Sequence, residues 1–223
     1  ISTNSFASTD NLFAYSANYR LRNDYIEDLK LEVHEFKPLP ASLPELFPRQ
    51  PLMARLATAK VEPGKPARAP FLCVHAKSLV VDGRIAFIGS YNLDPRSENL
   101  NTEVGLLIED EALARELQAE MEADMAPANS WVIARRTLPL RLDIVNGIVD
   151  DVLSLSPIDL WPIQNTSSFE LRPGAAHVPP GHPAFYDNHR DVGPFPGTEG
   201  FLSTKEIMTR LYKAVGSPRT PVL

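Results

Sequence analysis

The sequence predicts an α/β protein that ends in an irregular extension. Residues 8–135 alternate between patterns typical of helices and patterns typical of strands. The composition, with 43% hydrophobic and 22% charged residues, is that of a globular chain. Proline and glycine become frequent from residue 164 onward, so little regular structure is expected there. A chain of 223 residues is long enough for one core and an appendage.

The first elements are predicted to be a helix and a strand. The helix follows capping residues at positions 8–11, and its apolar positions recur near helical spacing: Leu12, Tyr15, Tyr19, Ile26 and Leu29. Residues 31–36 alternate between two faces, with Val33 and Glu35 on one and His34 and Phe36 on the other. We interpret His34 as structural, because nothing nearby completes a site around it.

A proline-rich basic segment, residues 37–70, comes next. Its eight prolines argue against a regular strand or a long helix. Six basic residues stand against two acidic ones, a local charge of +4. The segment is interpreted either as a solvated loop or as a basic rim that guides an anionic lipid or nucleic acid toward the residues that follow.

A β-hairpin is predicted over residues 79–88, with polar residues on either side of it. Asp82-Gly83 is a strong turn signal between two short β-branched and aromatic runs. Because side chains alternate along a strand, His75 and Lys77 point the same way. An imidazole can attack phosphorus or transfer a proton, and an ammonium neutralises a phosphate oxygen. This pair therefore fits phosphate chemistry better than a core.

The second strand of the hairpin runs into Gly89, Ser90 and Asn92. The glycine permits close approach of the backbone, and the serine and asparagine are small hydrogen-bond donors of matching parity. The whole pattern is H-x-K-x4-D-x6-G-S-x-N, formed by His75, Lys77, Asp82, Gly89, Ser90 and Asn92. It resembles the HKD motif of the phospholipase D superfamily. The continuation from Asn92 to Glu103 is similar to bacterial cardiolipin synthases, nearest the type C enzymes.

The resemblance implies a fold and a reaction. The fold is a phospholipase D-like α-β-α sandwich with a mixed central sheet over residues 1–138, the second catalytic half, carrying one HKD motif. Residues 139–223 then form a helical and proline-rich extension packed on it. Family members use two HKD motifs: one histidine forms a phosphohistidine and the other acts as general acid and base. The resemblance assigns the acid–base role to His75 and phosphate contacts to Lys77, Ser90 and Asn92, with no metal or other cofactor.

Three further residues complete the predicted site. Asp82 belongs to the motif but lies in the predicted turn, so a structural role is expected. Arg96 is expected to contact a second phosphate. Glu103, on a strand predicted over residues 102–108, matches the acid that orients a catalytic imidazole in the family. The alternative is an ordinary surface carboxylate at a strand end.

The remaining elements follow from periodicity. A helix is predicted over residues 111–125 with a core-facing stripe of Leu113, Leu117, Met121 and Met125, and a strand over 130–134. Residues 140–155 predict an apolar helix that lies in a membrane interface or packs on another half of the protein, and its acidic residues favour packing. The histidines at 177, 182 and 189 have no standard metal-ligand spacing and are expected in a surface loop.

Charge and resemblance together define the expected partners. The net charge of −6 disfavours a general nucleic-acid binder. Thr3-Asn4-Ser5 is similar to a segment in the second half of cardiolipin synthase relatives, so we expect a C-terminal half. Its partner is an N-terminal half with a first HKD motif, or a second copy of the chain.

The predicted function is phosphatidyl transfer or phosphodiester cleavage on phospholipids, by an enzyme at the periphery of a bacterial inner membrane. The alternatives are a homodimeric nuclease or phosphodiesterase, and a half-protein that binds without catalysis.

Overall fold

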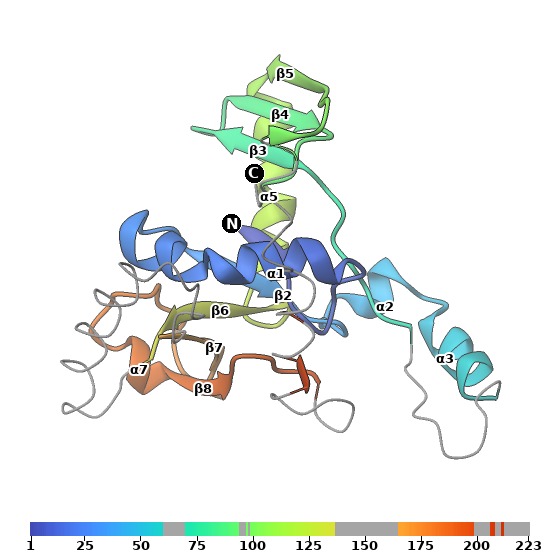
Figure 1. The fold of residues 1–223 in the computed structure, drawn as a ribbon, viewed down its shortest axis with the longest axis vertical. Helices are drawn as coiled ribbons and strands as arrows, with labels where there is room; N and C mark the ends of the chain where they lie inside the picture. The colour runs from blue at the N-terminus through green and yellow to red at the C-terminus, as the bar shows by residue number, and fades with distance from the viewer. Residues whose placement is uncertain are drawn as a thin grey trace.

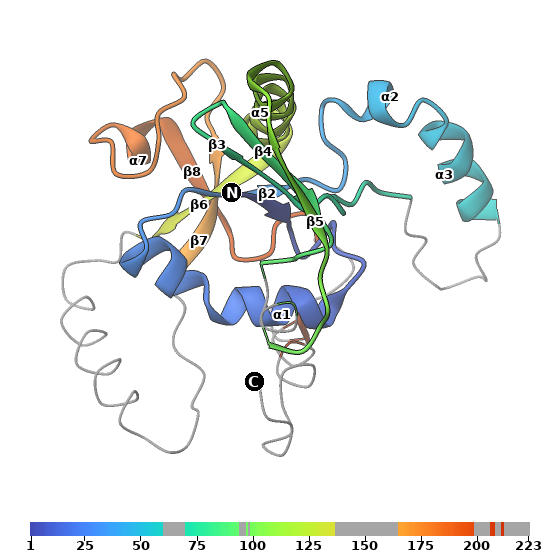
Figure 2. The same ribbon diagram turned by 90° about the horizontal axis from the view of Figure 1, so that it is seen from above.

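The structure, a computed structural model, describes residues 1–59, 70–93, 97, 99–136, 165–198, 206–207 and 211. This part of the chain forms two sheets, a main sheet of order β1-β2-β6-β7-β8 and a small sheet of order β3-β4-β5 (Figures 1 and 2). The combination of helices with a mixed sheet and an antiparallel sheet confirms the predicted mixed α/β class.

The main sheet contains both parallel and antiparallel pairs. Strand β1 (Ser2–Asn4) runs parallel to β2 (Val33–Phe36). Strands β6 (Ser130–Arg135), β7 (Thr166–Leu171) and β8 (His189–Gly193) are each antiparallel to the preceding strand in the sheet. The sheet is therefore mixed, as predicted, with β1 at one edge.

Helices cover the two faces of the main sheet. Helix α1 (Leu12–Arg20) lies on the face that carries Glu35, since the Tyr15 hydroxyl donates to the Glu35 carboxylate at 3.3 Å. The short helix α7 (Phe185–Asn188) packs through Phe185 against Val132 and Phe169. Glu35 is paired with the residue before Val132, and neighbouring residues of a strand face opposite ways, so the two helices lie on opposite faces.

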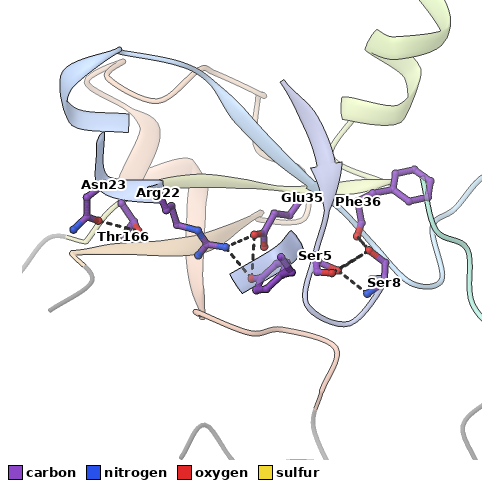
Figure 3. Close-up of polar contacts among 8 residues, drawn as sticks. Ser5, Ser8, Arg22, Asn23, Glu35, Phe36 and Thr166 are labelled. Carbon is purple, nitrogen blue, oxygen red and sulfur yellow. Dashed lines mark hydrogen bonds and ion pairs between the residues drawn. The ribbon is translucent and has the colours of Figure 1, made fainter. Parts of the chain in front are cut away.

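A buried polar cluster ties α1 and the turn after it to β2 (Figure 3). The Arg22 guanidinium forms an ion pair with Glu35 and also donates to the Tyr15 hydroxyl at 3.1 Å. Burial raises the pKa of the Glu35 carboxyl, and the charge of Arg22 opposes that rise. On the same side, the Ser8 hydroxyl donates to the Phe36 carbonyl at 2.9 Å. Buried charges need such partners, so the cluster fixes the position of α1 on the sheet.

The small sheet packs against helix α5 (Figure 1). Strands β3 (Ser78–Val81), β4 (Ile85–Gly89) and β5 (Gly105–Glu109) pair antiparallel in sequence order. Helix α5 (Glu111–Met125) begins where Asp110 caps it by accepting from the Leu113 N–H at 2.9 Å. It contacts strands of both sheets. The helix has the bounds predicted from periodicity, whereas β5 begins three residues later than the predicted strand.

The proline-rich segment contains two helices that the sequence did not predict. These are α2 (Leu43–Leu46) and α3 (Gln50–Ala59). Pro44 and Pro51 both lie in a first helical turn, where proline is tolerated because no intrahelical N–H is required. The interpretation of this stretch as a loop is therefore wrong for residues 43–59. Residues 60–69 lie outside the described part.

The C-terminal region supplies two strands to the main sheet. The sequence analysis predicted neither β7 nor β8, and it placed His189 in a surface loop, but this residue is buried on β8. Ile207 and Leu211 join a buried cluster with Phe6 and Phe195. The domain boundary predicted at residues 138 and 139 and the apolar helix predicted over 140–155 lie outside the described residues. In the part that is described, no helix is long and apolar enough to cross a membrane.

Candidate functional site

The segment that carries His75 and Lys77 is extended but lies just before β3, which begins at Ser78. The prediction that both residues stand on a regular strand is therefore not met. The ladder still continues one step beyond β3, because the Gly89 N–H donates to the Lys77 carbonyl at 3.0 Å. Further upstream, the Leu72 N–H donates to the Pro38 carbonyl at 3.0 Å. Lys77 is thus held in register with the small sheet.

The predicted hairpin turn is present. Asp82 and Gly83 have φ values of 53° and 61°, and the Arg84 N–H donates to the Val81 carbonyl at 3.0 Å. Two consecutive positive φ values at the centre of a hairpin are typical of a type I′ turn. Asp82 is exposed at the turn, at the other end of β3 from Lys77. The structure does not bring it near the other motif residues.

Ser90 and Glu103 are brought together at the opposite end of the small sheet. The Ser90 hydroxyl donates to the Glu103 carboxylate at 2.5 Å. The backbone holds the same pair of segments, since the Ser90 N–H donates to the Val104 carbonyl at 2.8 Å and the Val104 N–H donates to the Ser90 hydroxyl oxygen at 3.0 Å. The Glu103 side chain therefore contacts Ser90 of the motif. Glu103 precedes β5 and does not lie on it.

Charge and hydrogen bonding keep Glu103 ionised. Hydrogen bonds from Ser90 and then Ser97 lower the pKa of the Glu103 carboxyl, and the positive charge of Lys77 lowers it further. The Lys77 ammonium itself donates to the His75 carbonyl at 3.1 Å. One cation, one anion and one hydroxyl thus share a small area beside Gly89.

His75, two residues before Lys77, is exposed. Among the described residues, none hydrogen-bonds to its ring, and the Glu103 carboxylate is engaged with Ser90 instead. The role predicted for Glu103, orienting a catalytic imidazole, stays a prediction. An exposed imidazole near an ammonium is free to meet a substrate from solvent or from a facing protein surface.

Asn92 is positioned by a residue that the sequence analysis missed. Its backbone N–H donates to the Ser97 hydroxyl oxygen at 3.1 Å, and Ser97 is only 5% exposed. Ser97 therefore fixes the segment after Ser90 and also acts on Glu103. Ser97 is the last residue of the segment N-L-D-P-R-S, which lies within the stretch that resembles cardiolipin synthases, but the sequence analysis assigned it no role. Arg96, predicted to contact a second phosphate, lies outside the described residues.

Asn4 is a second residue that the sequence analysis missed. Its side-chain amide lies on β1 and bonds to the backbone of Val74, the residue before His75. The segment Thr3-Asn4-Ser5 was noted only for its resemblance. Cys73, the residue before Val74, is half-buried and accepts a hydrogen bond from the Asn4 amide at 3.4 Å.

Apolar side chains continue from the polar group along the open face of the small sheet. Leu79, Phe87 and Leu107 stand opposite one another across the three strands. Because Leu79 is two residues from Lys77, the two side chains share a face. The face is uncovered at Leu79 and Leu107, which are 56% and 69% exposed. The Lys77 side chain and an apolar patch therefore share one surface.

The side chains gathered here are of the types that can hold a phosphate and transfer a proton. Lys77 supplies positive charge, Ser90 supplies a hydroxyl, and His75 can act as an acid or a base. Across residues 1–59, 70–93, 99–136 and 165–198, no group of three or more His, Cys, Asp or Glu side chains could hold a metal ion.

Part of the chain matches a known family. Residues 44–125 match the family described as cardiolipin synthase, PLD-like domain. Cardiolipin synthase C of Escherichia coli is 57% identical over 42 residues, 19% of this chain and 9% of that protein. A cardiolipin synthase of Oceanobacillus iheyensis is 46% identical over 52 residues, 23% of this chain and 11% of that protein.

A longer match covers more of the chain at lower identity. A protein of Helicobacter pylori, itself described as uncharacterized, is 29% identical over 122 residues, 55% of this chain and 20% of that protein. The chain thus aligns with between 9% and 20% of the length of these three relatives. No solved structure matches the chain.

Proposed function

The chain belongs to the phospholipase D superfamily, and from this premise we propose that it supplies one of two HKD motifs for phosphatidyl transfer or phosphodiester cleavage on phospholipids. The observation that carries the proposal is that Ser90 is hydrogen-bonded to Glu103, and that Lys77, two residues after His75, lies close enough to lower the pKa of Glu103. The relatives named cardiolipin synthase support a phospholipid as the substrate class.

The proposed reaction has two steps. In the first, the histidine of a facing HKD motif attacks the phosphorus, the bond to the leaving alcohol breaks, and protonated His75 gives its proton to the leaving oxygen. In the second, neutral His75 takes the proton from an incoming alcohol or water, whose oxygen attacks the phosphohistidine and releases the histidine nitrogen. Each histidine ends the cycle in its starting state.

The neighbouring residues stabilise charge on the phosphoryl oxygens. Lys77 and the hydroxyl of Ser90 are the groups placed to do so, and Asn92 follows on the same segment. The hydrogen bond to Glu103 restrains the Ser90 hydroxyl, and Lys77 lies close enough to lower the pKa of Glu103. The exposure of His75 supports a site that a second motif covers, from an N-terminal half or from a second copy of the chain.

A lipid substrate is supported by the open face of the small sheet. The apolar side chains of Leu79 and Leu107 share a surface with Lys77, which matches a phospholipid, whose charged phosphate is bonded to apolar chains. We propose a peripheral membrane location on the same grounds.

The nuclease alternative has less support in the structure. The basic segment that favoured it carries Arg55 on α3, which projects from the body away from the small sheet (Figures 1 and 2). Its residues Lys60, Lys65 and Arg68 lie outside the described part. The nuclease and the non-catalytic half-protein therefore remain as outcomes of the test.

The test combines molar mass with turnover. Gel filtration with light scattering gives the oligomeric state, and release of glycerol from phosphatidylglycerol vesicles gives activity, each for the natural chain, for His75→Ala and for His182→Ala. His182 is an exposed histidine far along the sequence and serves as the matched control. We expect turnover to disappear in His75→Ala only. Equal turnover in all three would overturn the assignment of His75, and cleavage of DNA but not of lipid would favour the nuclease.

A chain that is monomeric and inactive alone calls for a second arm. Residues 44–125 replace the matching segment of the Escherichia coli enzyme, and the chimera is assayed with and without His75→Ala. Activity that depends on His75 supports the proposal. Loss of activity in a chimera that folds with a normal unfolding transition contradicts it.

A further inference from the structure

We propose that Asn4 is a positioning residue that sets the register of the His75 segment against the main sheet. This inference rests on the proposed function of His75 and goes beyond it, because Asn4 itself contacts neither the imidazole nor a phosphate. Asn4 lies at the end of β1, the edge strand of the main sheet, 71 positions before His75. Its side chain, and not the strand backbone, makes the connection.

The geometry is that of a two-sided amide bracket around Val74. The Val74 N–H donates to Asn4 Oδ1 at 2.8 Å, and Asn4 Nδ2 donates to the Val74 carbonyl at 2.8 Å. A peptide group in a neighbouring strand would offer the same donor and acceptor. Within the described residues, no backbone–backbone hydrogen bond joins β1 to residues 71–77. The side chain therefore replaces a ladder pair at the position before His75.

A further hydrogen bond fixes the orientation of the amide, because Asn4 Nδ2 also donates to Cys73 Sγ at 3.4 Å. The Ser8 hydroxyl oxygen lies 3.4 Å from Asn4 Oδ1, but the hydroxyl proton points to the nearer Phe36 carbonyl, at 2.9 Å. Nδ2 therefore uses both of its donor hydrogens, and Oδ1 accepts from the Val74 N–H. Only asparagine offers this pattern at this reach. Aspartate has the same shape but lacks the donors, and glutamine is longer by one methylene.

The bracket complements a second restraint on the other side of the segment. Lys77 is held by the hairpin through the N–H of Gly89, while Val74 is held by the main sheet through Asn4. His75 and Ala76 lie between the two restraints. Loss of the bracket would leave Lys77 and Ser90 in place but release His75, because only the restraint before His75 is removed.

The consequence is a separation between binding and catalysis. A phosphate held by Lys77 and Ser90 still binds when Asn4 is replaced, so KM is expected to stay near its natural value. Proton transfer requires His75 within hydrogen-bond reach of the reacting oxygen, and a misplacement of about 1 Å can lower the rate about 100-fold. Asn4→Ala is therefore expected to lower kcat by roughly that factor.

The first experiment is hydrogen exchange on the full chain, which does not depend on activity. In Asn4→Ala the Val74 amide is expected to exchange roughly 10-fold faster, with the increase confined to peptides covering residues 71–77. Asn4→Asp is expected to behave like Asn4→Ala, because a carboxylate cannot donate to the Val74 carbonyl. Ser2→Ala is the matched control on β1, since Ser2 Oγ makes no hydrogen bond to the residues described.

Each outcome decides the proposal. Unchanged exchange at residues 71–77 in Asn4→Ala overturns it, as does full protection in Asn4→Asp. Faster exchange spread evenly over the main sheet, with a lowered melting temperature, also overturns it in favour of a general structural role. The second experiment measures kcat and KM in the assay for phosphatidylglycerol turnover. If the chain alone shows no turnover, the proposed function is decided by the chimera, while local exchange at residues 71–77 still reports on Asn4 independently.

Discussion

At the scale of single residues, polar side chains hold both the site and the core in place. Ser90 illustrates this in the site, because its hydroxyl contacts Glu103 and its backbone pairs with Val104. Arg22 and Glu35 illustrate it in the core, where their buried ion pair joins the turn after α1 to β2. The first group is solvent-accessible and the second is not, so substitutions in the two places have different consequences.

Replacing Ser90 by alanine is expected to raise the pKa of Glu103 toward its ordinary value. The hydrogen bond from Ser90 is the largest of the causes that lower this pKa, and alanine removes it. The measurement is a titration of the side-chain carboxyl carbon by NMR, with Glu103→Gln identifying the signal. Ser97→Ala is the comparison, and it should produce a smaller rise. An unchanged titration in Ser90→Ala would show that the hydrogen bond does not form in solution.

Replacing Arg22 by methionine is expected to destabilise the fold by about 3–5 kcal/mol, because it leaves the Glu35 charge buried without a countercharge. The double variant Arg22→Met with Glu35→Leu should lose less than the sum of the two single variants, since no charge remains buried. Urea denaturation of the four proteins measures this coupling. Additive losses would mean that the two residues act independently.

At the scale of elements, the small sheet depends on two glycines placed opposite each other in β4 and β5. A side chain at Gly105 would meet the Phe87 ring at 2.2 Å, and the ring covers the space that the glycine leaves open, a device known for strengthening glycine-containing strands. A side chain at Gly89 would instead meet the Val104 carbonyl oxygen at 2.6 Å, which belongs to the backbone. Glycine to alanine therefore clashes with a side chain at Gly105 but partly with the backbone at Gly89, so a smaller residue 87 can relieve the clash fully only at Gly105.

Gly105→Ala is expected to cost about 1–3 kcal/mol through overpacking against Phe87. Adding Phe87→Leu should recover part of this loss, because the shorter side chain clears the new methyl group. Adding Phe87→Leu to Gly89→Ala should recover much less, since the clash there includes backbone atoms. Thermal unfolding of the single and double variants checks both statements. Equal recovery at the two glycines would contradict this account of their packing.

At the scale of the whole molecule, the face of the main sheet opposite α1 carries buried histidines. Burial lowers the pKa of His34 and the pKa of His189, with hydrogen bonds to Glu32 and to the Phe185 carbonyl acting in the opposite direction. His34 and His189 both lie near His177, whose charge opposes a second positive charge. Their neutral forms are therefore favoured in the folded protein.

This arrangement predicts loss of stability in mild acid. The unfolded chain has ordinary histidine pKa values of about 6.5, so below that pH it binds more protons than the folded protein. The free energy of unfolding should therefore fall as the pH drops from about 7 through about 6.5 and on toward the lowered folded pKa values. Urea denaturation across this range measures the slope.

His189→Asn is the variant that checks the cause. Its amide can still donate near the Phe185 carbonyl but does not titrate, so the dependence on pH should become shallower. His182→Asn, at an exposed position, should leave the slope unchanged. A slope that is identical in all three proteins would show that carboxyl groups, and not His189, govern the acid response.

The sequence alone was enough to predict the elements whose turn residues, caps and apolar pattern lie within one short stretch of the chain. The hairpin turn at Asp82-Gly83 needs two residues at positive φ, and that chemistry is readable directly. Helix α5 has its cap and its apolar stripe within one continuous run, so its bounds were predicted correctly. The six motif residues likewise identified the superfamily, because their spacing along one hairpin is a local property.

Features that depend on contacts between distant parts of the chain could be seen only in the tertiary structure. Strands β7 and β8 were missed because they gain their stability from pairing with β6 and with each other, not from a strong alternating pattern. The helices at residues 43–59 were missed because prolines in first turns look like helix breakers in sequence. Asn4 and Ser97 were missed for a related reason: a hydrogen bond to a distant backbone has no periodicity along the chain. The sequence by itself identified the motif residues, whereas the placement of Val74 against the main sheet follows from contacts between residues 70 positions apart.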